Sequence, residues 1–93
     1  MTKDEFLKLD PEKVEIIDIR EDDEVESIPL LRNTTHIPLS TVIERVKNGS
    51  LMKDKPIVTV CRSGRRCQIL NEFLVDNGYN AQYLEGGMIS LDY

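Results

Sequence analysis

Two cysteines and three arginines lie within one short segment of the chain. Residues 61–66 read Cys-Arg-Ser-Gly-Arg-Arg, and a second cysteine, Cys67, follows directly. A thiolate is a nucleophile, and the pKa of a cysteine falls below its usual value of about 8.5 beside cationic side chains or a helix N-terminus. The cysteine alone would fit a buried structural thiol equally well. Because a glycine and three arginines accompany it, we predict that Cys61 is a reactive thiolate.

The residues on either side of this segment predict how it is held. Residues 57–60 are all β-branched and mostly apolar, as in a buried strand. After Gly64, a helix is predicted from an apolar stripe, and it should stop near Asn77 and Gly78. A loop that enters a helix N-terminus presents unpaired backbone N–H groups and the positive end of the helix dipole. The loop is therefore a predicted anion site.

Other helices and strands are predicted on both sides of this unit. Thr2 and Glu5 resemble a capping box for a helix over residues 2–9. Strands are predicted at 14–19, near 36–37 and at 81–84, and a helix capped by Ser40 should end before Gly49. Alternating strands and helices indicate an α/β fold with three α/β/α layers and a small, mostly parallel sheet. Ligands bind at the carboxyl ends of such strands, where Cys61 lies.

Length and charge limit the classes of protein that need be considered. Ninety-three residues, 40% of them hydrophobic, suit one domain spanning 1–93. The formal net charge of −5 gives no general attraction to nucleic acid or to an anionic membrane. No apolar run approaches the ~18 residues that span a bilayer, and residues 1–9 lack the apolar core of a signal peptide. We expect a soluble cytoplasmic monomer that binds neither nucleic acid nor membrane.

Four segments, in this order, resemble the single-domain rhodanese-like (thiosulfate sulfurtransferase) family. The loop at 61–66 is similar to the family's six-residue active-site loop, and the others are Ile17-Asp18-Ile19-Arg20-Glu21, His36-Ile37-Pro38 and Tyr83-Leu84-Glu85-Gly86-Gly87. The resemblance covers residues 14–89. Thr35, Cys67 in place of a usual serine, and the lack of tryptophan after Gly87 depart from the family pattern. The family's last helix should be short or absent.

The resemblance implies sulfur transfer through a persulfide on Cys61. Its thiolate would take sulfane sulfur from thiosulfate, polysulfide or a protein persulfide and pass it to a thiol or protein acceptor. This is covalent catalysis in two half-reactions, and it requires neither a metal nor an organic cofactor. The expected substrate-binding residues are those of the loop: Arg62, Ser63, Gly64, Arg65 and Arg66.

The roles of the nearby polar residues are less specific. Asp18 and Arg20 follow a strand whose end should reach the same edge, and a structural ion pair or hydrogen-bond frame supporting the site is expected. Arg66 could bind the anion or pair with an inner carboxylate, and both roles stay open. His36 is assigned to structure. The acidic run from Glu21 to Glu26 is interpreted as a solvated face.

Cys67 has two possible roles. Cys67, Leu70 and Leu74 fall at i, i+3 and i+7, which places the cysteine on the apolar helix face as a small hydrophobe. We favour this core role. The alternative is a resolving thiol that attacks the Cys61 persulfide and releases its sulfur.

Two rival classes of protein remain. A cysteine phosphatase or arsenate reductase needs Cys-x5-Arg, but Cys67 occupies that arginine position and Val60 the usual histidine position. A non-catalytic binding module with the same fold often lacks the cysteine, which is present here. The sequence does not separate a small-molecule sulfurtransferase from a relay between proteins.

Overall fold

The computed structural model describes residues 1–92, and its centre is a parallel sheet of four strands. The strands lie in the order β2-β1-β3-β4. Their bounds are β1 Glu15–Asp18, β2 Thr35–His36, β3 Ile57–Val60 and β4 Ala81–Tyr83. All three pairings are parallel, which confirms the predicted α/β class. Every residue of β3 is buried, as expected for a central strand covered on both faces.

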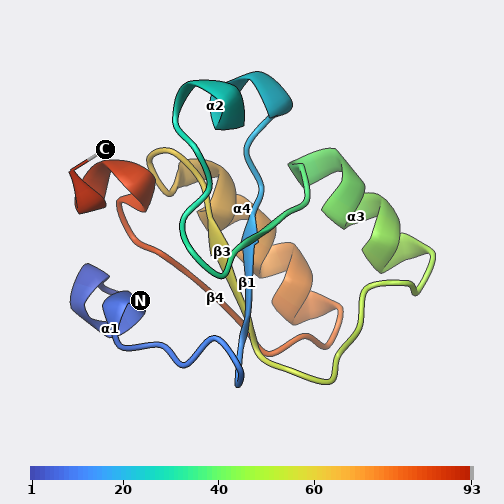
Figure 1. The fold of residues 1–93 in the computed structure, drawn as a ribbon. Helices are drawn as coiled ribbons and strands as arrows, with labels where there is room; N and C mark the ends of the chain where they lie inside the picture. The colour runs from blue at the N-terminus through green and yellow to red at the C-terminus, as the bar shows by residue number, and fades with distance from the viewer. Residues whose placement is uncertain (93) are drawn as a thin grey trace.

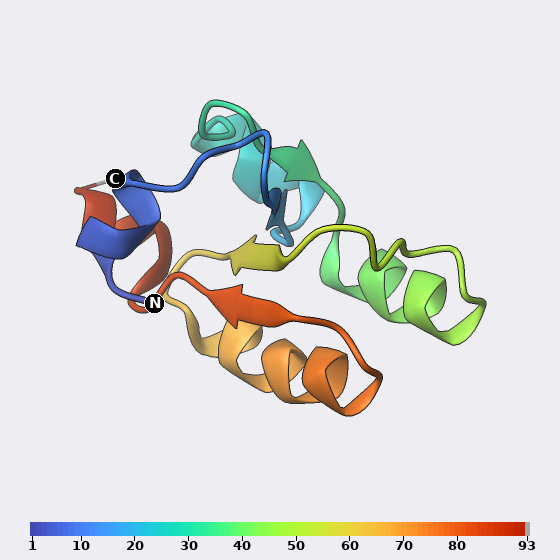
Figure 2. The same cartoon turned by 90° about the horizontal axis from the view of Figure 1, so that it is seen from below.

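Two helices cover one face of the sheet. They are α3, Leu39–Lys47, and α4, Arg65–Asp76, which lie along the same side of the strands in Figure 2. Between helices and sheet lies an apolar cluster that includes Ile17, Val42, Leu70 and both cysteines. Residues at the helical spacing Cys67, Leu70 and Leu74 are buried, so the predicted apolar stripe of α4 is confirmed.

The opposite face is covered by the two ends of the chain. Helix α1, Lys3–Leu7, has the predicted Thr2–Glu5 capping box and buries Phe6. A 3₁₀ helix, η1, spans Gly87–Leu91 and lies beside α1 in both views (Figures 1 and 2). A second apolar cluster, which includes Phe6, Val58 and Met88, fills this side. The layers are therefore α/β/α, with short elements on this second face.

Two features differ from the sequence interpretation. The acidic run is largely exposed, as expected of a solvated face, but Asp22–Ser27 within it forms helix α2, which lies above the carboxyl ends of the strands in Figure 1. A capping box between Glu21 and Glu24 starts this helix. Ser40 is not the helix cap, because α3 begins two residues earlier than such a cap would give, at Leu39 with Pro38 as the N-cap. The fixed φ of proline suits a helix start.

The sheet register places the predicted site residues at one edge. Asp18 pairs with Val60, and the Ile19 N–H donates to the Val60 carbonyl at 2.9 Å. The residues after β1 and the cysteine after β3 therefore leave the sheet at the same level.

No helix within residues 1–92 is long and apolar enough to cross a membrane.

Candidate active site

Cys61 is the first residue after β3 and is fully buried. The backbone N–H of Gly64 donates a hydrogen bond of 3.1 Å to its sulfur. Gly64 has φ +89°, and a Cβ there would lie 2.9 Å from the backbone nitrogen of Gly86. Glycine is needed at this turn both for its left-handed conformation and for its close contact with a neighbouring chain segment. The six-residue loop therefore closes over the Cys61 sulfur at a position that requires glycine.

The surroundings of Cys61 favour its thiolate. They lower the pKa of Cys61 from 9.0 to about 6. The largest cause is a hydrogen bond from the Cys67 side chain; the backbone N–H groups of Cys67 and Gly64 and the charge of Arg66 act in the same direction, against burial. The interaction of its S–H with the Cys61 sulfur, and then burial, raise the pKa of Cys67 far above its usual range. Of the two thiols, Cys61 therefore ionises more readily than Cys67.

Arg66 pairs with an inner carboxylate, which is one of its two predicted roles. Its Nη1 and Nη2 donate to the Glu24 carboxylate at 2.8 and 2.7 Å. This pairing lowers the pKa of Glu24 to about 2 and raises that of Arg66. A bidentate pair of this geometry is among the strong charge-assisted hydrogen bonds. It joins α2 to the first turn of α4 and fixes the orientation of the guanidinium.

Asp18 and Arg20 form a buried ion pair near the same edge. Arg20 Nε donates to both carboxylate oxygens of Asp18 at 3.0 and 2.9 Å, and its Nη2 lies 2.8 Å from Oδ2. Its Nη1 donates to the Glu24 carbonyl at 3.3 Å, and its own carbonyl accepts from His36 Nε2 at 2.7 Å. These contacts hold the start of α2 and the end of β2 together. Asp18, Arg20 and His36 thus make structural contacts.

The remaining loop side chains are exposed. Arg62, Ser63 and Arg65 face solvent, and none of them contributes to the lowered pKa of Cys61. A cavity of about 300 Å³ lies beside the loop, lined by Arg20, Asp23, Glu24, Ser27, Ile28, Arg62 and Met88.

The turn after β4 holds the loop from the opposite side. The N–H groups of Met88 and Ile89 donate to the carbonyls of Cys61 and Arg62 at 2.9 and 3.0 Å. Gly87 has φ +59°, and a Cβ there would lie 2.5 Å from both carbonyl oxygens. The Gly86-Gly87 segment therefore allows two stretches of backbone to meet at the reactive cysteine.

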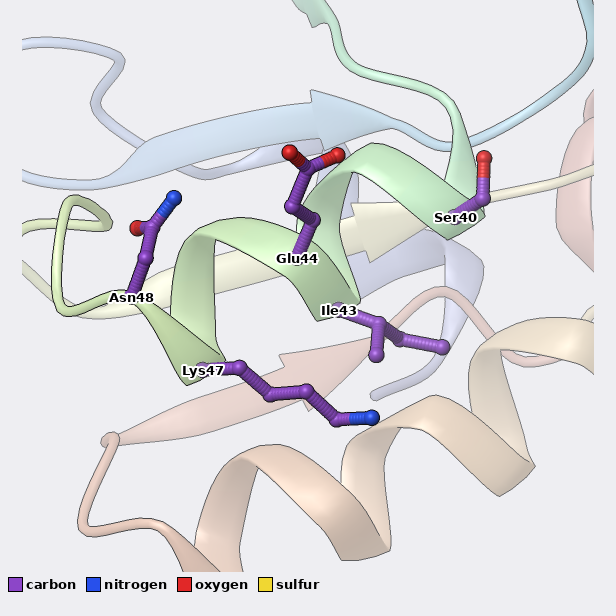
Figure 3. Close-up of a pocket in the computed structure, with 5 residues that line it drawn as sticks. All are labelled: Ser40, Ile43, Glu44, Lys47 and Asn48. Carbon is purple, nitrogen blue, oxygen red and sulfur yellow. The ribbon is translucent and has the colours of Figure 1, made fainter.

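Another surface hollow does not involve the cysteine loop. It measures about 500 Å³ and lies along α3, where its five lining residues come from the helix and its C-cap and point in different directions (Figure 3). These are Ser40, Ile43, Glu44, Lys47 and Asn48. The hollow contains no thiol, and we assign it no chemistry. Within residues 1–92, no three His, Cys, Asp or Glu side chains are grouped so as to hold a metal ion.

The fold agrees with the comparisons to known proteins. Residues 2–90 match the model of the rhodanese-like domain, and the chain belongs to this family. It is 34% identical, over 85% of its length and 74% of the relative, to a Bacillus subtilis protein named "Putative sulfurtransferase YtwF". A rhodanese-related protein of Thermoplasma volcanium has a similar structure, with TM-score 0.82 and 28% identity over 97% of this chain and 86% of that one. The family and the relative support a sulfurtransferase-type function.

A second group of relatives is much longer than this chain. The tRNA uridine(34) hydroxylase of Corynebacterium efficiens is 37% identical over 61% of this chain, but the matched part is only 18% of the enzyme. The match is thus confined to a minor part of a larger protein.

Sequence reasoning missed two residues that this structure places near Cys61. Glu24 was included in the solvated acidic run, although its position three residues after Glu21 is a capping-box signal. Thr59 lies in β3 two residues before Cys61 and is fully buried. Nothing in the local sequence distinguishes Thr59 from an ordinary strand threonine.

Proposed function

We propose that this protein is a sulfurtransferase that carries sulfane sulfur as a persulfide on Cys61. The observation that carries the proposal is the environment of the sulfur: a buried cysteine with a pKa of about 6, bonded by the Gly64 N–H at 3.1 Å. A preformed set of donors around one sulfur stabilises negative charge there without reorganisation. Family membership supports the same chemistry.

The reaction proceeds in two half-reactions. The Cys61 thiolate attacks the outer sulfur of thiosulfate, the sulfur–sulfur bond of the donor breaks, and sulfite leaves with the bonding electron pair. Cys61 then bears the persulfide. An acceptor thiolate attacks the outer persulfide sulfur, the bond to Cys61 breaks, and the Cys61 sulfur takes that electron pair as a thiolate. Neither step requires a cofactor. Because the donor product leaves before the acceptor reacts, ping-pong kinetics are expected.

The proposed substrates are small sulfur-containing anions, with a thiol or a protein as acceptor. The chain has a net charge of −5, which repels anions. The exposed side chains of Arg62 and Arg65 supply local positive charge for an anionic donor near Cys61. Arg66 is engaged by Glu24, so we assign it to the frame of the loop. Ser63 and Gly64 contribute backbone N–H groups.

Phosphatase chemistry is disfavoured by the same geometry. The helix begins at Arg65, directly after Gly64, so the loop encloses the cysteine with no extra residue before the helix. The position of a phosphatase arginine is occupied by Cys67, which is buried in the apolar cluster. The site therefore lacks both the wider anion-binding loop and the arginine that hydrolysis of a phosphate ester needs.

The function is tested by following sulfite released from thiosulfate in the presence of a small thiol. We expect turnover that requires Cys61 and gives parallel double-reciprocal lines. Cys61→Ser should be inactive, because a hydroxyl at this position is far less nucleophilic. Cys61-dependent hydrolysis of an aryl phosphate with no sulfite release would contradict the proposal.

A further inference from the structure

A cavity of about 300 Å³ lies between helix α2 and the cysteine loop, and the proposed function gives it no role. Two of its lining residues adjoin the reactive cysteine. Arg62 follows Cys61 in sequence, and the Met88 N–H donates to the Cys61 carbonyl at 2.9 Å. At roughly 30 Å³ per water, the volume equals that of about ten waters, so a small organic molecule fits in it. Such a molecule would lie next to the cysteine loop.

Helix α2 lines the cavity with one of its faces. The lining residues Asp23, Glu24 and Ser27 fall at positions i, i+1 and i+4, which share a side of a helix. The neighbouring acids Asp22 and Glu26 do not line the cavity. Only two carboxylates of the acidic segment therefore reach it.

Two of the charged groups around the cavity are already paired. The Glu24 carboxylate is bound by Arg66, and Arg20 belongs to the buried ion pair at the end of β1. Asp23 and Arg62 have no salt-bridge partner among residues 1–92. The cavity therefore offers one unpaired anion on α2 and one unpaired cation on the cysteine loop.

The anion at Asp23 does not suit a negatively charged sulfur donor. A carboxylate repels thiosulfate, but it attracts an ammonium group. Arg62 attracts a carboxylate, and Ile28 and Met88 supply apolar surface beside these two charges. The ligand that matches all three features is a small molecule with an ammonium group, a carboxylate and a short aliphatic stem.

We propose that this cavity binds the sulfur acceptor and that the acceptor is an amino-acid thiol. Asp23 accepts hydrogen bonds from its ammonium group, and Arg62 binds its carboxylate. The inference rests on the proposed function, because the acceptor has to meet a persulfide on Cys61. Asp23 is a specificity-determining residue, since it binds a part of the acceptor that does not react.

The reaction is the second half-reaction of sulfur transfer. The acceptor thiolate attacks the outer sulfur of the Cys61 persulfide, and the bond between the two persulfide sulfurs breaks. Cys61 keeps that electron pair as a thiolate, and the acceptor leaves as a persulfide. The ammonium and carboxylate groups of the acceptor are unchanged.

The first test measures binding without sulfur transfer. S-methylcysteine, a thioether that cannot accept sulfur, is titrated into the protein while the backbone amide NMR signals are followed. We expect shifts at the residues that line the cavity and an affinity about threefold or more weaker in Asp23→Asn, as for loss of one ion pair. Methylthiopropanoate, which lacks the ammonium group, should bind wild type and Asp23→Asn equally.

Asp22→Asn is the matched control for this titration. Asp22 lies in the same first turn of α2, its side chain is 88% exposed, and it does not line the cavity. The substitution changes the net charge by the same amount and should leave the affinity for S-methylcysteine unchanged. The absence of shifts at the lining residues, or equal losses in the two variants, would overturn the proposed site.

The second test measures acceptor preference in protein preloaded with sulfur. The persulfide is discharged by cysteamine, which carries an ammonium group, and by mercaptoethanol, which carries a hydroxyl group instead. The ratio of the two rate constants, compared between variants, removes the intrinsic difference between the thiols. We expect Asp23→Asn to lower this ratio about threefold or more and Asp22→Asn to leave it unchanged.

The two tests separate failure of this inference from failure of the proposed function. A protein that takes up no sulfur from any donor contradicts the proposed function, whereas the titration with S-methylcysteine still decides whether the cavity is a binding site. A protein that loads and discharges normally, with the same ratio in wild type and Asp23→Asn, is a sulfurtransferase whose acceptor does not use this cavity. That result would overturn the inference alone.

Discussion

The Glu24 carboxylate and the Arg66 guanidinium face each other in a bidentate pair at 2.8 and 2.7 Å, across 42 positions of sequence. Both side chains are partly buried. The pair joins α2 to the beginning of α4, so the acidic segment after β1 becomes a wall of the cysteine site. It also engages Arg66, whose charge favours the Cys61 thiolate.

Replacing Glu24 with Gln should destabilise the protein by about 1 kcal/mol at neutral pH, since a partly buried bidentate pair is stronger than an exposed one. Glu24 has a folded-state pKa of about 2, below its usual 4.5. Its contribution is therefore fully present above pH 4.5 and is lost as the pH falls towards 2. Denaturant unfolding of wild type and Glu24→Gln across this range measures the effect.

The matched control is Glu26→Gln, an exposed acid on the same helix. It should change stability by less than about 0.5 kcal/mol, as is usual for surface substitutions. Equal losses in the two variants would mean that net charge, and not the pair with Arg66, is responsible.

The rate of persulfide formation should follow the ionisation of Cys61. With a pKa of about 6, the thiolate dominates at neutral pH, and the rate should fall in proportion to the thiolate fraction as the pH drops below 6. Single-turnover release of sulfite from thiosulfate, measured between pH 4.5 and 9, gives the midpoint. A midpoint near 9, the ordinary value, would show that the surrounding donors do not act on the sulfur.

Gly87→Ala should disrupt the cysteine loop. The added Cβ would lie 2.5 Å from the carbonyl oxygens of Cys61 and Arg62, at a φ of +59°. A strained backbone and an overpacked contact each cost roughly 1–3 kcal/mol, so we expect a loss of about 3 kcal/mol or more together with impaired sulfur transfer. Gly49→Ala is the control, because its φ is +77° but nothing lies within 4 Å.

Gly49→Ala should cost only about 1–2 kcal/mol and leave sulfur transfer intact. The comparison separates backbone strain from the contact with the loop. Similar stability and activity in the two variants would contradict the role of Gly87 in holding the cysteine segment.

Arg62→Ala and Arg65→Ala should each raise the thiosulfate KM and reduce its salt dependence, while the Cys61 pKa stays near 6. Both side chains are exposed and neither acts on the Cys61 pKa. Steady-state kinetics at low and high ionic strength test this, because screening weakens exposed charges. Identical salt responses in the wild type and both variants would exclude a role for these arginines in donor approach.

Local patterns predicted most of the fold. The capping box of α1, the apolar strand β3 and the stripe on α4 each depend on neighbouring residues, and the structure confirms all three. Helix α2 could not be recognised in the same way. It has no buried residue, so it lacks an apolar period, and a long-range bond from Arg66 holds it in place together with a local bond from Arg20.

The candidate site was predicted in outline from its loop. Spacing identified Cys61 and its glycine, but it could not decide between two roles for Arg66, because the partner Glu24 is remote in sequence. For Cys67, helical spacing predicted burial correctly. The interaction of Cys67 with the Cys61 sulfur depends on how the loop folds back. The sequence pattern does not specify this fold of the loop.

The most direct test of the account is the intact mass of the protein before and after incubation with thiosulfate, and again after a small thiol. We predict the gain of one sulfur atom on Cys61, located by fragmentation, and its complete loss to the thiol. Cys61→Ser should gain nothing, and Cys67→Ser should still be loaded. A wild-type mass unchanged by thiosulfate, polysulfide and a protein persulfide alike would contradict a sulfur-carrying Cys61.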